Sequence, residues 1–174
     1  MARKERFSIR ARVSIGVLSA LAMAGEVAAQ RGDDDAAPVE RHYIAKDWAA
    51  YSQGTAADAD RLCWVATRAF RSDPDGQREV LTDVLMLVTT EPQTSVTGIP
   101  SGIQIDLVLD GRGFPMFGRG GRAWLSEDEA ERPVLDRLAG SATVRLQSAA
   151  VPVADFSSNG FAEAYEVAQE LCAR

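Results

Sequence analysis

Histidine and cysteine are scarce in this chain of 174 residues, which contains one histidine and two cysteines. A single imidazole cannot supply a histidine-rich metal site, and it weakens every nucleophilic mechanism that needs a histidine base. That histidine, His42, lies next to a polar segment in which a fixed geometry is hard to maintain, and no Gly-x-Ser-x-Gly motif is present. We therefore predict no catalytic residue, no metal site and no cofactor.

Positive charge is also in short supply. The chain has 19 Lys and Arg against 25 Asp and Glu, a net charge of −6, whereas a surface that binds nucleic acid needs concentrated basic residues. Apolar residues make up 46% and charged residues 25% of the chain, which is typical of a globular protein. At this length we expect a single domain with one core, and no nucleic-acid partner.

Residues 1–29 show the three parts of a secretory signal peptide. Five basic residues precede Val13, an apolar run extends to about Val27, and the residues up to Ala29 suit cleavage after that position. The run is shorter than the roughly 20 residues that span a bilayer, which argues against a membrane anchor. We expect a periplasmic or secreted protein without an integral membrane span, whose 14 basic and 23 acidic mature residues give a charge of −9.

Residues 30–42 are polar and acidic and include Pro38. This composition predicts a mobile leader before a single domain that covers residues 43–174. The leader contains Arg31-Gly32-Asp33, the tripeptide that some adhesive proteins present to integrins. We interpret it as a chance match, because a pattern of three residues recurs easily.

The two cysteines are Cys63 and Cys172, and export to an oxidising compartment lets such a pair persist as a disulfide. A redox role is the alternative, but no Cys-x-x-Cys motif is present. We predict a structural disulfide that joins the C-terminus to the start of the folded region.

Short strand-like segments separated by turns dominate the predicted domain. Residues 103–110 alternate between apolar and polar, which indicates a strand with one buried face. Asp110-Gly111 is a hairpin signal with residues 114–117 as the return strand, and the apolar run over residues 80–90 favours a central strand covered on both faces. Further strands are predicted over residues 43–51, 62–67, 122–125 and 143–146.

Two helices are predicted among these strands. The first covers Glu131–Ala139, with Pro133 in its first turn and Gly140 after its end. The second runs from about Gly160 to Ala173 with Ser158 or Asn159 as its cap. Its residues Phe161, Tyr165, Ala168 and Cys172 form one stripe, which places Cys172 on the core-facing side.

These elements predict a mostly β fold. We expect an antiparallel β-sandwich, immunoglobulin-like or barrel-like, with one short helix and a C-terminal helix. Trp48, Trp64 and Trp124 could form a platform that stacks on sugars, but large aromatic side chains in a domain of this size favour the core, and we predict all three there.

Several short motifs follow one another along the predicted domain. They are Asp47-Trp48, Cys63-Trp64, Val88-Thr89-Thr90-Glu91-Pro92, Ala123-Trp124, Asp155-Phe156-Ser157, Gly160-Phe161 and the final Cys172. Their order resembles the invasion-associated locus B family of secreted bacterial proteins. The resemblance spans roughly Tyr43 to Cys172, and it implies a compact, mostly β domain with an export signal. The arginine-glycine pair that the family usually has before the final Asp-Phe-Ser is absent here.

A glycine-rich stretch over residues 111–122 carries Arg112, Arg119 and Arg122. The strand-like residues after it argue against a phosphate-binding loop of the type that opens a helix, and they favour a hairpin turn. The planar guanidinium group suits carboxylate and sulfate groups, so these arginines are our candidate residues for binding an anion, a polysaccharide or a protein partner.

The sequence therefore predicts an exported, non-enzymatic binding protein of the bacterial envelope, whose partner is an envelope or host protein or a polysaccharide. The first alternative is a small envelope hydrolase that uses a pair of carboxylates. The second is a passive structural or stress protein. A convergent pair of carboxylates in a cleft would favour the hydrolase, and an exposed apolar or arginine-lined patch would favour binding.

Overall fold

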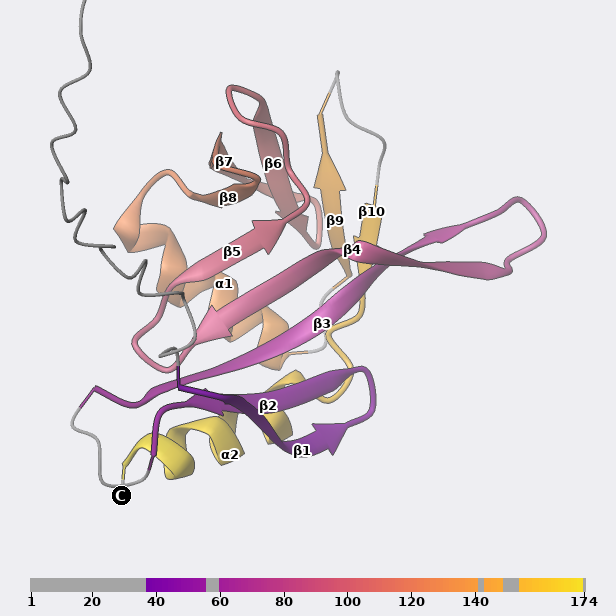
Figure 1. Ribbon diagram of the computed structural model, residues 1–174. Helices are drawn as coiled ribbons and strands as arrows, with labels where there is room; N and C mark the ends of the chain where they lie inside the picture. Colours follow the sequence, from indigo (N-terminus) through magenta and orange to yellow (C-terminus); the bar gives the residue numbers. More distant parts are fainter. Residues whose placement is uncertain (1–36, 56–59, 141–142, 149–153, 174) are drawn as a thin grey trace, which may run out of the picture. The chain divides into compact units, whose positions relative to one another are not determined.

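The computed structural model describes residues 37–55, 60–140, 143–148 and 154–173, which belong to one structural unit. The predicted signal peptide, most of the predicted leader and Arg31-Gly32-Asp33 lie outside these residues. The strands are β1 (Val39–Ala45), β2 (Trp48–Gln53), β3 (Leu62–Ser72), β4 (Arg78–Thr89), β5 (Thr94–Thr97), β6 (Gln104–Leu109), β7 (Arg112–Arg119), β8 (Arg122–Leu125), β9 (Val144–Gln147) and β10 (Ala154–Phe156). The helices are α1 (Glu131–Ala139) and α2 (Phe161–Cys172), and a 3₁₀ turn, Asp128–Ala130, precedes α1 (Figure 1).

Eight of these strands close into an antiparallel barrel. The order is β3-β10-β9-β6-β7-β8-β5-β4, and the pairing of β4 with β3 completes the ring. The described strands thus form one continuous sheet rather than the two packed sheets of a sandwich. The predicted mostly β, antiparallel and barrel-like fold is confirmed, and the sandwich is not.

Strand β3 is the junction of the sheet. One of its edges pairs with β4 along Trp64–Ser72, while the other edge pairs with β2 along Leu62–Thr67 and with β10 at Phe70. The β1–β2 hairpin therefore extends from the barrel instead of entering the ring. Because one long strand accommodates two neighbours along one edge, the sheet closes and still carries a side extension (Figure 1).

The core follows the alternation of side chains along these strands. In β6, Ile105, Leu107 and Leu109 point inward and are buried, whereas Gln104 and Asp106 are exposed. Val134, Leu135 and Leu138 of α1 are buried in the same core, and α2 adds Phe161, Ala164 and Ala168. Helix α2 packs against β1, β2 and β3. It therefore covers one face of the β1–β2 hairpin, which lies outside the ring of strands.

The predicted hairpin at Asp110-Gly111 is confirmed. Asp110 has a φ of 49° and Gly111 a φ of 80°, the two positive values that a type I′ turn requires. The turn joins β6 to β7, which pair from Leu109–Arg112 to Gln104–Phe117. A two-residue signal in the sequence therefore sets the register of this hairpin.

The boundaries of several strands differ from the prediction. Strand β1 begins at Val39, so the last four residues of the predicted leader are part of the sheet, where they pair with β2 after Pro38. The first half of β4 is exposed, and Val80 is 54% exposed, because this half projects with the end of β3 as a hairpin beyond the barrel (Figure 1). Strands β5 and β10 have only four and three residues, too few to show an alternation of apolar and polar side chains in the sequence.

Both helices occupy the predicted regions, and α1 matches its predicted range. The prediction of Ser158 or Asn159 as the cap of α2 is wrong. The cap residue is Gly160, which has a φ of 90° and makes no side-chain capping bond. A Cβ at this position would lie 2.0 Å from the carbonyl oxygen of Ala45. The close approach of α2 to the β1–β2 turn therefore requires glycine.

We expect Gly160→Ala to destabilise the protein more than the same change at Gly76. Both glycines have positive φ, which costs an alanine about 1–2 kcal/mol, but no atom lies within 4 Å of a Cβ at Gly76. The measurement is the free energy of unfolding of the two variants. Equal losses would contradict the close packing of α2 on Ala45.

Candidate functional site

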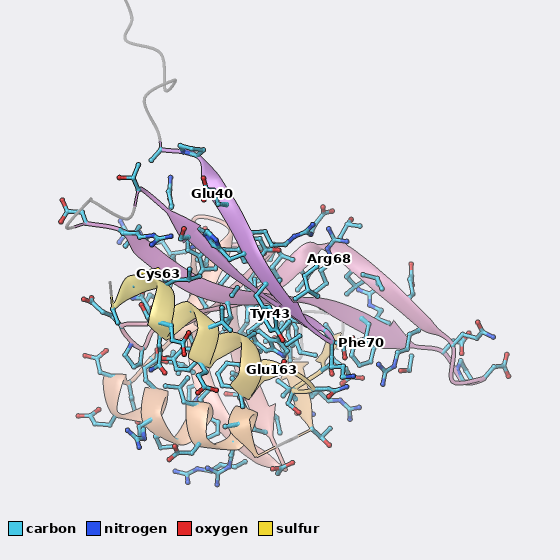
Figure 2. All side chains as sticks on the ribbon, turned by 90° about the horizontal axis from the view of Figure 1, so that it is seen from below. Glu40, Tyr43, Cys63, Arg68, Phe70 and Glu163 are labelled. Carbon is cyan, nitrogen blue, oxygen red and sulfur yellow. A yellow bond between two sulfur atoms is a disulfide. The ribbon has the colours of Figure 1, made fainter. Side chains whose placement is uncertain are left out.

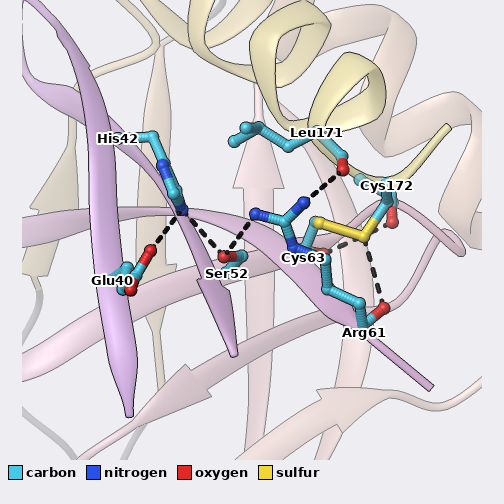
Figure 3. Close-up of a disulfide and its surroundings, with 8 residues drawn as sticks. Glu40, His42, Ser52, Arg61, Cys63, Leu171 and Cys172 are labelled. Atoms are coloured by element: carbon cyan, nitrogen blue, oxygen red, sulfur yellow. Dashed lines mark hydrogen bonds and ion pairs between the residues drawn. A yellow bond between two sulfur atoms is a disulfide. The ribbon is translucent and has the colours of Figure 1, made fainter. Parts of the chain in front are cut away.

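The disulfide predicted from the sequence is confirmed, because Cys63 and Cys172 are bonded with their Cα atoms 6.0 Å apart. It joins the start of β3 to the last residue of α2 (Figure 3). Arg61 reinforces this link by donating hydrogen bonds to the Leu171 carbonyl, at 2.8 Å, and to the Ser52 hydroxyl, at 3.1 Å. At the other end of α2, the Tyr43 hydroxyl of β1 donates to Glu163 (Figure 2).

The single histidine takes part in this network. The His42 Nε2 atom lies 2.8 Å from the Ser52 hydroxyl and 3.7 Å from a carboxylate oxygen of Glu40 (Figure 3). The expectation that His42 lacks a fixed geometry is therefore wrong, since β1 extends through it. In a catalytic triad, however, the acid and the serine bind opposite nitrogens of the ring. Here both contact the same nitrogen, and Ser52 is fully buried, so we assign this cluster a structural role.

The three tryptophans do not share one environment. Trp48 is fully buried, its ring centroid lies 5.0 Å from that of Phe161, and its Nε1 donates to the Ser157 carbonyl at 2.7 Å. Trp64 and Trp124 are only partly buried. They alternate with inward-facing neighbours such as Val65 and Ala123, so they point outward. The prediction that all three are core residues is correct only for Trp48.

The three candidate arginines do not converge. Arg119 and Arg122 are cross-strand partners at the end of the β7–β8 hairpin. Arg112 lies at the opposite end of β7, where its guanidinium carbon is 5.1 Å from the centroid of the Phe114 ring. Consequently Arg119 and Arg122 can contact one ligand, while Arg112 belongs to a different part of the surface.

A groove of about 510 Å³ crosses the outer face of strands β1 to β4. Four exposed cationic side chains line it, together with one carboxylate, Asp47. The cationic residues are Arg41 of β1, Lys46 of the β1–β2 turn, Arg68 of β3 and Arg78 of β4. The excess of positive charge here contrasts with the net charge of −6 of the whole chain.

These cations are largely free to bind a ligand. Arg78 lies over the Phe70 ring, with its guanidinium carbon 4.4 Å from the centroid. Within the described ranges, no ion pair involves any of the four cations. The floor and rim also include Ile44, which is 56% exposed, and Val80. The groove therefore offers positive charge beside apolar surface.

A second hollow of about 370 Å³ surrounds an outward-facing aromatic pair. Phe117 of β7 and Trp124 of β8 are stacked with their ring centroids 5.7 Å apart, and Phe117 is 50% exposed. We call this pair the aromatic platform. Polar side chains surround it, and they are Gln93, Arg119, Asp128 and Glu131. Arg119 is thus the candidate arginine that lies beside the aromatic platform.

Glu131, which lines the hollow beside the platform, is held in place by hydrogen bonds from Thr94. Both of its carboxylate oxygens accept hydrogen bonds from the Thr94 backbone N–H at 2.9 Å, and one accepts the Thr94 hydroxyl at 2.7 Å. Burial is the main cause that raises the pKa of Glu131, and the nearby Asp128 adds to it, against the lowering effect of the Thr94 hydrogen bonds. The carboxylate therefore joins the start of α1 to the start of β5.

This raised pKa has a consequence for stability. The folded protein binds the Glu131 proton more tightly than the unfolded chain, so the free energy of unfolding falls as pH rises from the ordinary glutamate pKa through the folded value. We expect the difference in stability between the protein and Glu131→Gln to shift in favour of the variant as pH rises from about 4 to 7. Urea unfolding of both proteins across this range measures the shift, and a constant difference would contradict it.

Metal ligation finds no support in the residues that the structure describes, where no cluster of three or more His, Cys, Asp or Glu side chains could hold an ion. Asp73 stabilises the turn between β3 and β4, because its carboxylate accepts the Gln77 N–H at 2.7 Å. In the same part of the chain, no helix is long and apolar enough to cross a membrane.

Comparisons with known proteins found no match for this chain, whether against protein-family models, curated proteins or solved structures. The resemblance to the invasion-associated locus B family accordingly stays a prediction. The functional interpretation depends on the geometry of the groove and the platform.

Proposed function

We propose that this protein is an exported, non-enzymatic binding protein of the bacterial envelope, and that the groove on β1 to β4 is its binding site for an anionic ligand. The export signal predicted for residues 1–29 and the resemblance to invasion-associated locus B proteins support the location. The observation that carries the proposal is the set of four cations around one open groove, none of which forms an ion pair with a residue that the structure describes.

The charge distribution supports an anionic ligand. A protein with a net charge of −6 repels anions on average, so a local cluster of Arg41, Lys46, Arg68 and Arg78 against Asp47 alone is a specific feature of this face. Arginine side chains suit carboxylate groups because the guanidinium plane donates two parallel hydrogen bonds.

The apolar part of the groove restricts the ligand further. Ile44, Phe70 and Val80 line it beside the cations, and exposed apolar surface next to polar groups is typical of binding sites. A small inorganic anion would leave this surface unused. An acidic polymer with apolar faces fits both components.

The test compares two double variants of equal net charge. Arg41→Glu/Arg68→Glu reverses the charge of two of the four groove cations. Arg112→Glu/Arg132→Glu makes the same change in net charge on β7 and α1. We expect labelled polyglutamate to bind Arg41→Glu/Arg68→Glu at least about tenfold more weakly than it binds the control variant, a loss of about 1.4 kcal/mol of binding free energy. Fluorescence anisotropy measures both affinities. We also expect the affinity of the unmodified protein to fall as salt is added.

Equal affinities of the two double variants would contradict the groove as the binding site. Weakening by the control variant alone would instead place binding near Arg112, one of the arginines proposed from the sequence. Both outcomes are informative because all four substituted side chains are solvent-accessible, which limits their effect on the fold.

The geometry also bears on the alternative of a small hydrolase. Asp128 and Glu131 both line the hollow beside the platform, and Asp128 raises the pKa of Glu131, as expected for a general acid. Yet the hydrogen bonds from Thr94 occupy both oxygens of Glu131, and this favours a structural role. Release of reducing ends from an acidic polysaccharide, lost in Glu131→Gln and in Asp128→Asn, would establish the hydrolase instead.

A further inference from the structure

We propose that the ligand is an acidic polysaccharide that lies across the outer face of the sheet, with its carboxylates in the groove and a sugar ring on the aromatic platform. This inference rests on the proposed function, because it names the chemical class of the ligand that binds the groove. It adds a second contact region, formed by Phe117, Trp124 and Arg119.

A continuous row of outward-facing residues connects the two hollows. Each member of the row is the cross-strand partner of the next, so all lie on one face of the sheet. The row runs Ile44, Ala49, Ala66, Leu87, Ser95, Trp124, Phe117 and Gln104 across strands β1, β2, β3, β4, β5, β8, β7 and β6. Ala66 lines the groove and Trp124 lines the platform hollow.

The distance along this row suits an extended polymer. Ala66 and Trp124 are separated by three strand-to-strand steps, which corresponds to roughly 14 Å along the sheet at about 4.8 Å per step. The two residues between them are Leu87, which is partly buried, and Ser95, which is 5% exposed. One chain of a few sugar units can therefore contact both hollows.

The platform has the features that bind a sugar ring. The apolar C–H face of a pyranose packs against an aromatic face, and two stacked rings leave one such face toward solvent. Phe117 keeps half of its surface exposed although it is a large apolar residue. Gln93, Arg119 and Asp128 line the same hollow and offer donors and acceptors to hydroxyl and carboxylate groups.

The direction of the row favours a polysaccharide over an acidic peptide. A peptide binds a sheet by adding a strand to a free edge, and the edge of β1 is poorly suited to this. Pro38 precedes β1, and the register shifts between Arg41 and Tyr43, features that protect an edge strand from pairing. The row runs across the strands, where a peptide backbone finds no ladder partners but a chain of sugar rings can stack.

The experiment uses two anionic probes, oligogalacturonate and oligoglutamate of matched charge, and the leucine variants Phe117→Leu and Trp124→Leu. Leucine keeps apolar bulk and removes the aromatic face. We expect each variant to bind oligogalacturonate at least about fivefold more weakly and oligoglutamate with affinity unchanged within twofold. Tyr43→Leu is the matched control, because Tyr43 is an exposed aromatic residue that lines neither hollow and donates to Glu163 of α2, and it should leave both affinities unchanged.

The outcomes separate this inference from the proposed function. Binding of oligoglutamate without binding of oligogalacturonate would overturn the polysaccharide and leave the anion-binding groove intact. Failure of both probes to bind would overturn the proposed function itself. Equal weakening of both probes, or none, by the platform variants would overturn the role of the platform. The exposed side chain of Phe117 makes Phe117→Leu decisive even if Trp124→Leu fails to fold.

Discussion

Reduction of the Cys63–Cys172 disulfide is expected to lower the stability of this protein by about 4–5 kcal/mol, because the bond closes a loop of 109 residues in the unfolded chain. For a domain of this size the loss corresponds to a fall in Tm on the order of 10–20 °C. Cys172→Ser should have the same effect. The last turn of α2 then loses its covalent attachment to β3, while the hydrogen bond from Arg61 to the Leu171 carbonyl remains.

Two measurements check this expectation. Thermal unfolding with and without reductant gives the change in Tm, and thiol titration of the denatured, unreduced protein should find no free cysteine. Leu171→Ala changes a partly buried neighbour on the same turn without touching the disulfide, so it is the control for local packing. An unchanged Tm after reduction, or two titratable thiols, would contradict the account of the bond.

Trp48→Ala is expected to cost about 3–5 kcal/mol of stability, the range for removing a fully buried large aromatic side chain. Trp48 is 0% exposed and connects two elements and a loop, since it lies in β2, packs edge-on against Phe161 of α2 and donates to the Ser157 carbonyl between β10 and α2. Its removal leaves a cavity where the β1–β2 extension meets α2 and an unpartnered carbonyl at Ser157.

Trp124→Ala is the matched control, because it removes the same side chain from the outer face of the barrel. We expect a loss of no more than about 1 kcal/mol there, from the contact with Phe117. Chemical denaturation of both variants measures the two losses. A loss at Trp124 as large as that at Trp48 would show that the platform belongs to the core.

Sequence patterns were sufficient where the determinant is local. The hairpin at Asp110-Gly111, the alternation in β6 and the extent of α1 depend on neighbouring residues, and each was predicted. The disulfide followed from the cysteine count together with the predicted export. In these cases the interacting groups, or the reason for their pairing, can be read directly along the chain.

Closure of the barrel could not be predicted in the same way. It depends on β3 pairing with β4 along one edge and with both β2 and β10 along the other, and these registers join segments far apart in the sequence. Strand β10 has only three residues, Ala154–Phe156, which is too short to show alternation. A sandwich and a barrel share the same strand patterns, so the patterns alone did not distinguish them.

The candidate site was predicted in part. Arg119 and Arg122 were identified from composition, but Arg112, close to them in sequence, lies at the far end of β7. The groove was missed because Arg41, Lys46, Arg68 and Arg78 come from three strands and a turn, and each is an ordinary surface residue by itself. One signal was present in the sequence of β3. Ala66, Arg68 and Phe70 occupy alternate positions, and this alternation places Arg68 on the outward face of the strand.

The central claim is that an anionic ligand binds the groove on the outer face of β1 to β4, and amide chemical-shift mapping tests it most directly. Isotope-labelled protein is titrated with oligoglutamate, and the shifted amides are placed on the structure. The account predicts that the largest shifts fall on Arg41, Arg68 and their neighbours in β1 to β4, while α1 and β9 stay unchanged. Saturable shifts confined to α1, β9 or the end of β7 at Arg112 would contradict it.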